Sequence, residues 1–365
     1  KQISKIIKIL EEALSEIIGT SMKNIKSDKS ITEIGLDSLM LNQFRNWIQS
    51  NMEINFPLMK LAKGPNLTDL SSSILEILID LDKNDSSENK EKVSDIANDS
   101  DLDITPDKWL IRVKSNKNNS KKIKIFCLHP VGAGASIFSH FMFNPPKDTE
   151  IICLQMPGRE NRLNESHYSD MKKLIPDLAN IIASHIDCPV VFWGHSWGGV
   201  TLYEVIKYLR RTNNAKYKNI LQLIVTGSIA PQLTVPWKDR DSIKETAKES
   251  NNIDKIISTV SYVDDENFIR QIIPIMKKDM KLITTYRYIE EEKLDLPILA
   301  FGAKEDDVVL LKELEKWQDQ TSSNFILHTV HGDHWFLSRN KEFILEKIEH
   351  SLLPSYELNK KHNLG

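Results

Sequence analysis

Apolar residues in the first 79 positions recur at helical spacing. Between residues 3 and 17 they fall at every third or fourth position, which predicts an amphipathic helix. A second helix is expected at about residues 38–50 and a third at about 68–79, where Thr68 is a favourable N-cap. Because the apolar stripe of one helix has to be covered by another, residues 1–79 are predicted to form a small all-α helical bundle.

From about residue 109 the pattern changes to alternating strands and helices. Six short apolar runs are the predicted strands: residues 123–128, 150–154, 189–193, 221–227, 296–302 and 324–330. Stretches with helical spacing lie between most of them. This alternation predicts a mainly parallel sheet covered by helices on both faces. We also expect residues 114–122 to be the loop of a hairpin that joins strands at 110–113 and 123–128.

Two segments interrupt these patterns. Residues 80–108 hold ten acidic residues and four lysines with few apolar residues, so they are predicted to be an extended, flexible linker. Residues of about 236–294 form a long insertion with helical apolar spacing between two expected strands. The second domain is therefore expected at 109–353, with a C-terminal tail at 354–365.

Composition narrows the possible functions. The 365-residue chain has a net charge of −3 and no basic run interleaved with aromatic residues, so neither nucleic acid nor a membrane surface is an expected partner. No apolar run approaches the roughly 18 residues of a membrane span and no signal-peptide pattern opens the chain, so a cytoplasmic protein is expected. The sequence begins at Lys1 rather than Met, as an excised piece of a longer polypeptide would.

The three cysteines give no sign of a metal site. Cys127, Cys153 and Cys188 each lie in or beside an apolar run, and none of them forms a C-x-x-C pair. This arrangement indicates buried thiols in a reducing compartment. No bound metal is therefore expected.

The most specific chemical signal lies in residues 188–211. An apolar run ends in the pentapeptide G-H-S-W-G at 194–198, and a helical pattern follows at once. Glycines on both sides allow a sharp turn from strand to helix with a serine at its tip, so Ser196 is the candidate nucleophile. A G-x-S-x-G pattern also occurs by chance, but the strand before it and the helix after it favour catalysis.

This strand–turn–helix context resembles that of the α/β hydrolases, whose triad follows in the order Ser, Asp, His. Residues 330–337, VHGDHWFL, resemble the segment that carries the base in thioesterases, and residues 156–162 and 274–286 resemble two segments of type II thioesterases. The resemblance runs through nearly all of 109–353. It implies an α/β-hydrolase fold in which the insertion at 236–294 forms a helical lid over an acyl pocket.

The same resemblance implies a base and an orienting acid. The base falls at His334, with His331 as the alternative, whereas His195 and His129 are expected to be structural histidines. Matching the family pattern G-G-x-x-D-x-x-V to this chain places the acid at Asp306.

The neighbours Glu305 and Asp307 stay open as alternatives to Asp306. Spacing alone does not separate adjacent carboxylates, and two of the three could simply be solvated turn residues.

The oxyanion of a tetrahedral intermediate needs two N–H donors already in place. One is the backbone N–H of Trp197, which follows the nucleophile. Residues 127–135, CLHPVGAGA, resemble the H-P-x-G-G segment of synthase-linked thioesterases, which implies Val131 as the second donor, although the same glycines suit a plain strand-to-helix connection. Trp197 stands where Met or Leu is usual, and we expect its ring to narrow the entrance to the acyl site.

Residues 34–40, IGLDSLM, stand at the head of the second expected helix and resemble the attachment motif of acyl carrier proteins. In that family the serine, here Ser38, bears a 4′-phosphopantetheine arm, and a helix N-terminus favours the phosphate esterified there. Asp37 and Ser38 would also suit simple helix capping. The place of the motif, about 35 residues into a helical unit of about 80, favours the carrier.

Together these resemblances imply an acyl carrier joined to a type II-like thioesterase, as at the end of a polyketide or mixed polyketide–peptide synthase. Ser38 would carry the acyl thioester, and Ser196, His334 and Asp306 would release it by hydrolysis. The implied partners are a phosphopantetheinyl transferase, the acyl chain and upstream synthase modules in the same polypeptide. Macrolactonising release and a non-catalytic scaffold with a binding-only hydrolase domain are the alternatives.

Overall fold

In the computed structural model the chain divides into two units, one formed mainly by the residues up to Leu102 and one by most of the residues after it. The structure describes residues 2–36, 38–52, 54, 56, 60, 61, 63–84, 102–105, 108–113, 123–234 and 266–362. None of the helices in these ranges is both long and apolar enough to cross a membrane.

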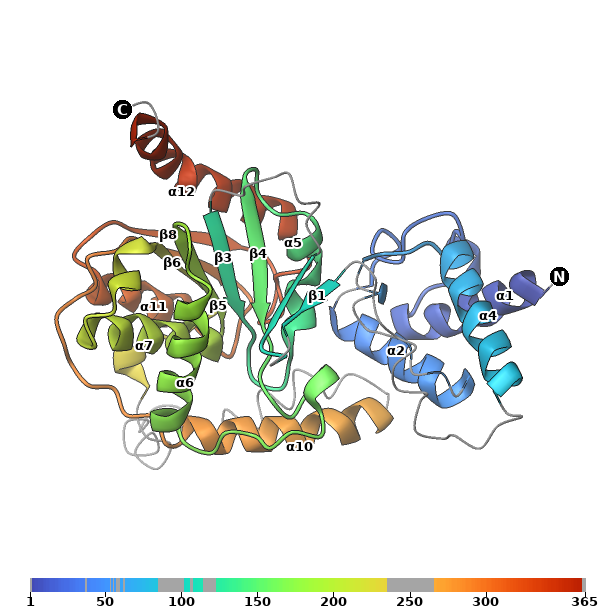
Figure 1. The fold of residues 1–365 in the computed structure, drawn as a ribbon. Coiled ribbons are helices and arrows are strands. Elements are labelled where there is room, and N and C mark those ends of the chain that lie inside the picture. Colours follow the sequence, from blue (N-terminus) through green and yellow to red (C-terminus); the bar gives the residue numbers. More distant parts are fainter. Residues whose placement is uncertain are drawn as a thin grey trace. The chain divides into compact units, whose positions relative to one another are not determined.

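The first unit is helical (Figure 1). Its helices are α1 (Gln2–Ile18), α2 (Ser38–Met52) and α4 (Leu67–Asn84), and α1 packs against both of the others. Their apolar stripes meet in a shared core that includes Leu10, Leu14, Phe44, Ile48, Leu70 and Ile74. Helices therefore lie at the three places where the sequence predicts them.

The third helix begins one residue earlier than expected. Its N-cap is Asn66, whose side-chain oxygen accepts a hydrogen bond from the Asp69 N–H at 2.8 Å. The prediction that Thr68 is the cap was therefore wrong, because Thr68 already lies inside the helix that starts at Leu67. Asn and Thr are both favourable caps, so the choice between them depends on local geometry.

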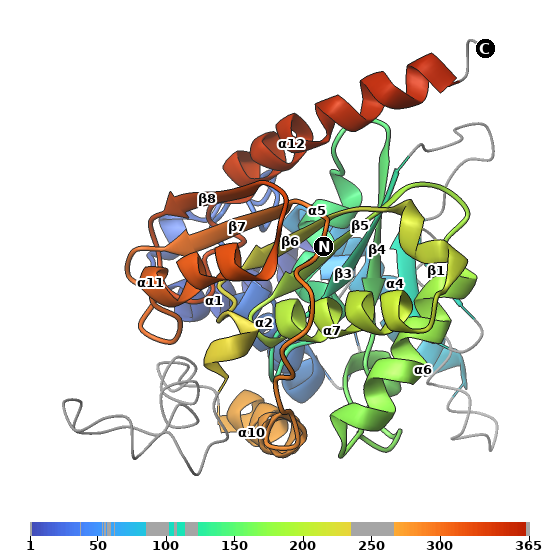
Figure 2. The same cartoon turned by 90° about the vertical axis from the view of Figure 1, so that its left-hand side faces the viewer.

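A sheet forms the centre of the second unit (Figure 2). Eight strands of the described residues are arranged in the order β1-β2-β4-β3-β5-β6-β7-β8. Their bounds are β1 Leu102–Ile104, β2 Leu110–Val113, β3 Ile123–Leu128, β4 Thr149–Leu154, β5 Val190–His195, β6 Ile220–Thr226, β7 Ile298–Ala303 and β8 Phe325–Val330. Strands β3 to β8 pair in parallel, which confirms the six predicted strands and the mainly parallel sheet.

The predicted hairpin was wrong. Strand β2 pairs antiparallel with β4, with Leu110 opposite Leu154, and β4 separates β2 from β3 in the sheet. The predicted loop at 114–122 lies outside the described residues. Strand β1 and the last residues of α4 fall within the segment that the sequence predicts to be a linker, 80–108.

Helices cover both faces of the sheet (Figure 2). On one face α6 (Met171–Ser184) packs against α7 (Trp197–Arg211), which lies on β3, β5 and β6. On the other face lie α5 (Ser139–Phe143) and α12 (Lys341–His362). Helix α6 illustrates why a helix packs on the sheet. Its apolar residues repeat at helical spacing and form one buried stripe, which includes Leu174, Leu178 and Ile182.

Two more helices follow later strands, and short 3₁₀ turns complete the described structure. Helix α10 (Glu266–Ile283) precedes β7, and α11 (Leu311–Leu314) follows it. The 3₁₀ turns are Met22–Asn24, Ala135–Phe138, Glu160–Arg162, Ala215–Asn219, Pro231–Leu233 and Glu315–Gln320. Helix α10, drawn in orange in Figure 1, belongs to the insertion predicted as a lid, and residues 236–265 of that insertion lie outside the described residues. The lid over an acyl pocket stays a prediction.

Candidate active site

The turn between β5 and α7 holds Ser196 in an unusual backbone conformation. Its φ is 52° and its ψ is −124°, a region that residues with a side chain rarely occupy. Such a conformation is expected to store about 1–3 kcal/mol of strain. Gly198 makes the turn possible, because a Cβ atom there would lie 2.2 Å from the Leu128 carbonyl oxygen. Glycine at position 198 therefore allows the tight turn that holds Ser196 at its tip.

Three side chains from separate loops meet at this turn. His334 Nε2 lies 2.9 Å from Ser196 Oγ, and His334 Nδ1 lies 2.8 Å from Asp306 Oδ2. His334 and Asp306 are both buried. With Nδ1–H donated to the carboxylate, Nε2 is left to accept the hydroxyl proton, which is the arrangement that a general base needs.

Asp306 is fixed by its own loop after β7. Its second oxygen, Oδ1, accepts hydrogen bonds from the N–H groups of Val308 and Val309, both at 2.9 Å. The carboxylate therefore presents Oδ2 to His334 in one orientation. The family spacing that places Val309 three residues after the acid corresponds to this backbone contact.

The alternative acids and base lie elsewhere. Asp307 is exposed. Glu305 instead pairs with His331 at 3.0 Å, and the His331 side chain is 78% exposed. The structure therefore brings Ser196, His334 and Asp306 together and leaves these three residues outside the hydrogen-bonded group.

The two histidines that were expected to be structural are buried and neutral. His195 Nδ1 donates to the Thr226 carbonyl at 2.8 Å, and its ring stacks on that of His334 with centroids 5.3 Å apart. Burial is the main cause that lowers the pKa of His195 to about 3, and repulsion from the adjacent His334 ring when that ring is protonated adds to it. His129 Nδ1 donates to the Pro130 carbonyl at 2.9 Å, and burial, with the nearby Arg159, lowers its pKa to about 3 as well.

The two predicted oxyanion donors lie on segments that flank the elbow. Trp197 is the first residue of α7, where helical N–H groups have no partner within the helix. Val131 is buried in the loop after β3. Among the turn and loop hydrogen bonds between backbone groups of the described residues, none is donated by the Val131 N–H. Their role toward a bound carbonyl stays a prediction.

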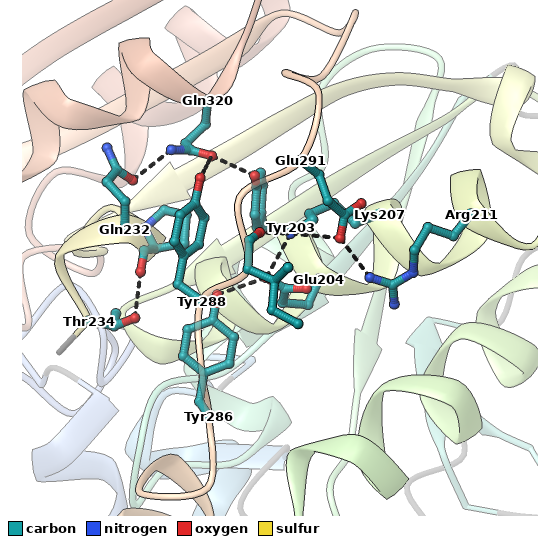
Figure 3. Close-up of polar contacts among 12 residues, drawn as sticks. Tyr203, Glu204, Lys207, Arg211, Gln232, Thr234, Tyr286, Tyr288, Glu291 and Gln320 are labelled. Carbon is teal, nitrogen blue, oxygen red and sulfur yellow. Dashed lines mark hydrogen bonds and ion pairs between the residues drawn. The ribbon is translucent and has the colours of Figure 1, made fainter. Parts of the chain in front are cut away.

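A polar network holds the segment after α10 against α7 (Figure 3). The Lys207 ammonium is fully buried and lies 3.2 Å from Glu291 and 3.5 Å from Glu204. The Tyr286 hydroxyl donates to Glu204 at 2.7 Å, and the Tyr286 ring packs edge-on against Trp197, with centroids 5.3 Å apart. Burial raises the pKa of Glu204, and the Lys207 ammonium opposes that rise. This network joins α7, the helix that starts at the elbow, to residues 286–291, which follow α10.

Sequence reasoning assigned no role to two charged residues near the candidate donor loop. Arg159 and Asp279 form a buried ion pair, with Nη2–Oδ1 at 2.7 Å and Nη1–Oδ2 at 2.8 Å. The available signal was that both residues lie in segments matched to type II thioesterases, yet nothing in the sequence indicates that they touch. Elsewhere, the described part of the chain holds no group of three or more His, Cys, Asp or Glu residues arranged for a metal ion.

The candidate attachment residue lies in the first unit. Ser38 is the first residue of α2, and Leu36, two residues earlier, is buried. The Ser38 side chain and Asp37 lie outside what the structure describes. The placement at the start of a helix agrees with the position that the carrier motif implies.

Family comparisons match both units. The model of the thioesterase domain matches residues 123–352, and the model of the phosphopantetheine attachment site matches residues 8–74. The gramicidin S biosynthesis protein GrsT of Aneurinibacillus migulanus is 30% identical over 259 residues, covering 68% of this chain and 96% of that protein. The linear gramicidin dehydrogenase LgrE of Brevibacillus parabrevis is 28% identical, covering 69% of this chain and 95% of its own length.

Solved structures support the fold of the second unit. The type II thioesterase BorB from the borrelidin biosynthetic cluster superposes with a TM-score of 0.56 at 21% identity, covering 67% of this chain and 97% of that one. The elbow between β5 and α7, the parallel sheet and this likeness together confirm the predicted α/β-hydrolase fold.

Proposed function

Because the chain belongs to the thioesterase family and carries a phosphopantetheine attachment domain ahead of the thioesterase domain, we propose that it is a terminal carrier–thioesterase pair that releases an acyl chain by hydrolysis. GrsT, which is named as a gramicidin S biosynthesis protein, and LgrE, whose name also refers to gramicidin, support a place in a peptide or polyketide synthase. Upstream synthase modules in the same polypeptide would supply the acyl chain.

The observation that carries the proposal is the continuous hydrogen-bonded path from Asp306 through His334 to Ser196. A domain that only binds partners gains nothing from a strained serine whose hydroxyl faces a buried, oriented imidazole. The strain and the alignment are useful when Oγ has to attack a carbonyl carbon. The path therefore favours catalysis over the scaffold alternative.

The first unit has the chemistry that the phosphopantetheine arm requires. Ser38 offers a hydroxyl at the start of α2, a helix of 15 residues whose free N–H groups favour a phosphate. Buried apolar residues on both sides of it, Leu36 and Leu41, anchor this end of the helix to the core of the unit. When attached, the arm supplies a terminal thiol that holds the acyl chain as a thioester.

In the first half of the reaction, Ser196 takes over the acyl group. His334 Nε2 accepts the hydroxyl proton as Oγ attacks the acyl carbonyl carbon, and Asp306 stabilises the imidazolium that forms. The N–H groups of Trp197 and Val131 stabilise the negative charge on the carbonyl oxygen. His334 then gives the proton to the leaving sulfur as the carbon–sulfur bond breaks, which leaves an ester on Ser196.

In the second half, water replaces the arm. His334 Nε2 takes a proton from water as the water oxygen attacks the ester carbonyl, and the same two N–H groups stabilise the second oxyanion. The imidazolium then protonates Ser196 Oγ as the carbon–oxygen bond breaks. The product is a free carboxylic acid, and Ser196 is restored.

Hydrolysis and macrolactonisation differ in the atom that attacks the ester. A cyclase has to keep water away while the chain folds back, whereas a hydrolase admits water. The test loads a hydroxyl-bearing acyl chain on Ser38 in ¹⁸O-labelled water. We expect a labelled free acid, and an unlabelled lactone as the main product would replace hydrolysis with cyclisation.

The catalytic part is tested with the Ser196→Ala variant of the full chain. Both proteins are loaded with the same acyl-pantetheine group by a phosphopantetheinyl transferase, and the bound acyl mass is followed by intact-protein mass spectrometry. Wild type should lose the acyl mass while Ser196→Ala keeps it. Equal rates of loss in the two proteins would return the domain to the binding-only alternative.

A further inference from the structure

Arg159 and Asp279 form a two-point ion pair inside the second unit. The two guanidinium–carboxylate contacts are 2.7 and 2.8 Å long, and the residues are 2% and 8% exposed. Burial alone would raise the pKa of the Asp279 carboxyl, but the Arg159 guanidinium holds it below its ordinary value. Asp279 is therefore a charged carboxylate on the buried face of α10.

This pair is bonded to the backbone of the loop that carries the candidate donor. Asp279 Oδ2 accepts from the Gly132 N–H at 2.9 Å, and Arg159 Nη1 donates to the Ala133 carbonyl at 3.0 Å. These are the two residues directly after Val131. The pair thus fixes one N–H and one C=O of the loop from the side of α10.

The other side of Val131 is fixed by His129. The Pro130 carbonyl accepts from His129 Nδ1 at 2.9 Å, and it belongs to the same peptide plane as the Val131 N–H. In a trans peptide the N–H points opposite to the C=O, so holding one directs the other. Val131 therefore lies between two held peptide planes. His129 orients the plane that contains the Val131 N–H, and Asp279 orients the next plane, which contains the Val131 carbonyl and the Gly132 N–H.

The loop also needs Gly132 and a close α10. Gly132 has a φ of +76°, a left-handed conformation that favours glycine, and a Cβ atom there would lie 2.5 Å from Met276 Cγ. Met276 and Asp279 lie one turn apart on α10. Both contacts disappear if the helix moves away from the loop.

A buried ion pair is weak evidence for a stabilising role, because apolar residues of similar volume often give equal stability. Apolar residues, however, form no directional hydrogen bonds to the backbone. A charged pair with bonds to consecutive backbone groups holds a peptide in one orientation, and an oxyanion donor acts through its orientation.

We propose that Asp279 and Arg159 are positioning residues, which hold the Val131 N–H in the orientation that stabilises the oxyanion and so make this half of the oxyanion hole depend on α10. The inference rests on the proposed function, since it assigns Val131 as a donor. It predicts that loss of the pair weakens transition-state binding and leaves substrate binding nearly unchanged.

The test compares Asp279→Ala and Asp279→Asn with wild type, using an acyl-pantetheine thioester as substrate and an alkylboronic acid as probe. The boronate binds Ser196 as a charged tetrahedral adduct, so it reports on the oxyanion site. For Asp279→Ala we expect kcat and boronate affinity both to fall about 10²-fold, the usual effect of losing one donor. KM should change less than about twofold. Asp279→Asn keeps an acceptor for Gly132 and should lie between Asp279→Ala and wild type.

Three controls separate the possible outcomes. Lys277→Gln, at an exposed position of the same helix, should match wild type. A purely structural role would lower the thermal midpoint and leave kcat and boronate affinity of the folded protein unchanged, which would overturn the inference. If Asp279→Ala does not fold, Asp279→Asn decides by the same criterion. Ser196→Ala should be inactive throughout, and activity in that variant would overturn the proposed function instead.

Discussion

Two serines with a proposed chemical role, Ser38 and Ser196, stand at the starts of helices, and they differ in how far apart in the sequence the residues lie that their roles require. Ser38 is the first residue of α2 in the helical unit, and the buried residues Leu36 and Leu41 lie close to it in the sequence. Ser196 precedes α7 at a φ of 52°, and its hydroxyl faces a histidine 138 residues away.

The difference bears on the reactivity that we propose for each unit. A serine that another enzyme modifies needs a recognisable helix start, so its signal is contained in a few adjacent residues. A serine that attacks a carbonyl needs a base, an acid and oxyanion donors, and the residues proposed for these roles lie at the start of α7 and in loops after β3, β7 and β8. The hydrolase serine therefore depends on the packing of the whole sheet, and the carrier serine does not.

The largest effect is expected at the carrier. Incubation with coenzyme A and a phosphopantetheinyl transferase should add one arm to wild type and none to Ser38→Ala, because no other hydroxyl has the motif. Intact-protein mass measures the arm directly. Ser38→Ala should still hydrolyse a free acyl-pantetheine thioester, and its modification by the transferase would remove Ser38 as the attachment site.

Substitution of Ser196 at the elbow should abolish release of the acyl group and leave attachment of the arm unchanged. Ser196→Ala removes the nucleophile, and in serine hydrolases such a loss lowers kcat by about 10⁶-fold. The variant should still accept one arm on Ser38. The release of free acid from the loaded protein is the quantity to measure, and loss of loading in this variant would contradict the independence of the two sites.

A smaller loss is expected for Asp306→Asn. The amide no longer selects the imidazole tautomer that leaves Nε2 free, and the corresponding change in a serine protease lowers kcat about 10⁴-fold. The matched control is Asp307→Asn, at an exposed position one residue on, which should stay within about twofold of wild type. If the control shows the larger loss, the acid has been assigned one position too early.

The sequence predicts the features that depend on adjacent residues. The six parallel strands and the turn at Ser196 follow from local patterns of apolar residues and glycine. The hairpin failed because strand pairing is a non-local choice: β2 lies next to β4 rather than next to β3, the following strand in the sequence. Arg159 and Asp279 were missed for the same reason, since 120 residues separate two partners that touch only in the folded chain.

Acid should produce the smallest effect, again in the hydrolase unit. Because the pKa of Asp279 is lowered in the folded protein, its contribution to stability is complete above the ordinary aspartate pKa of about 3.9 and is lost as pH falls through the folded value. The free energy of unfolding of wild type should therefore exceed that of Asp279→Asn by a constant amount above about pH 5 and by less below about pH 4. Urea unfolding at several pH values measures this difference. A gap that widens in acid would contradict the assigned charge.

The central claim is that an acyl group on Ser38 passes through Ser196 before it is released. The most direct test loads the 365-residue chain with a slowly hydrolysed acyl group, quenches samples in acid at short times and maps the acyl mass by peptide mass spectrometry. We expect the mass to leave the Ser38 peptide, to appear on the Ser196 peptide and then to appear as free acid. Free acid that forms at the same rate in wild type and Ser196→Ala, with no acyl mass on the Ser196 peptide, would contradict the account.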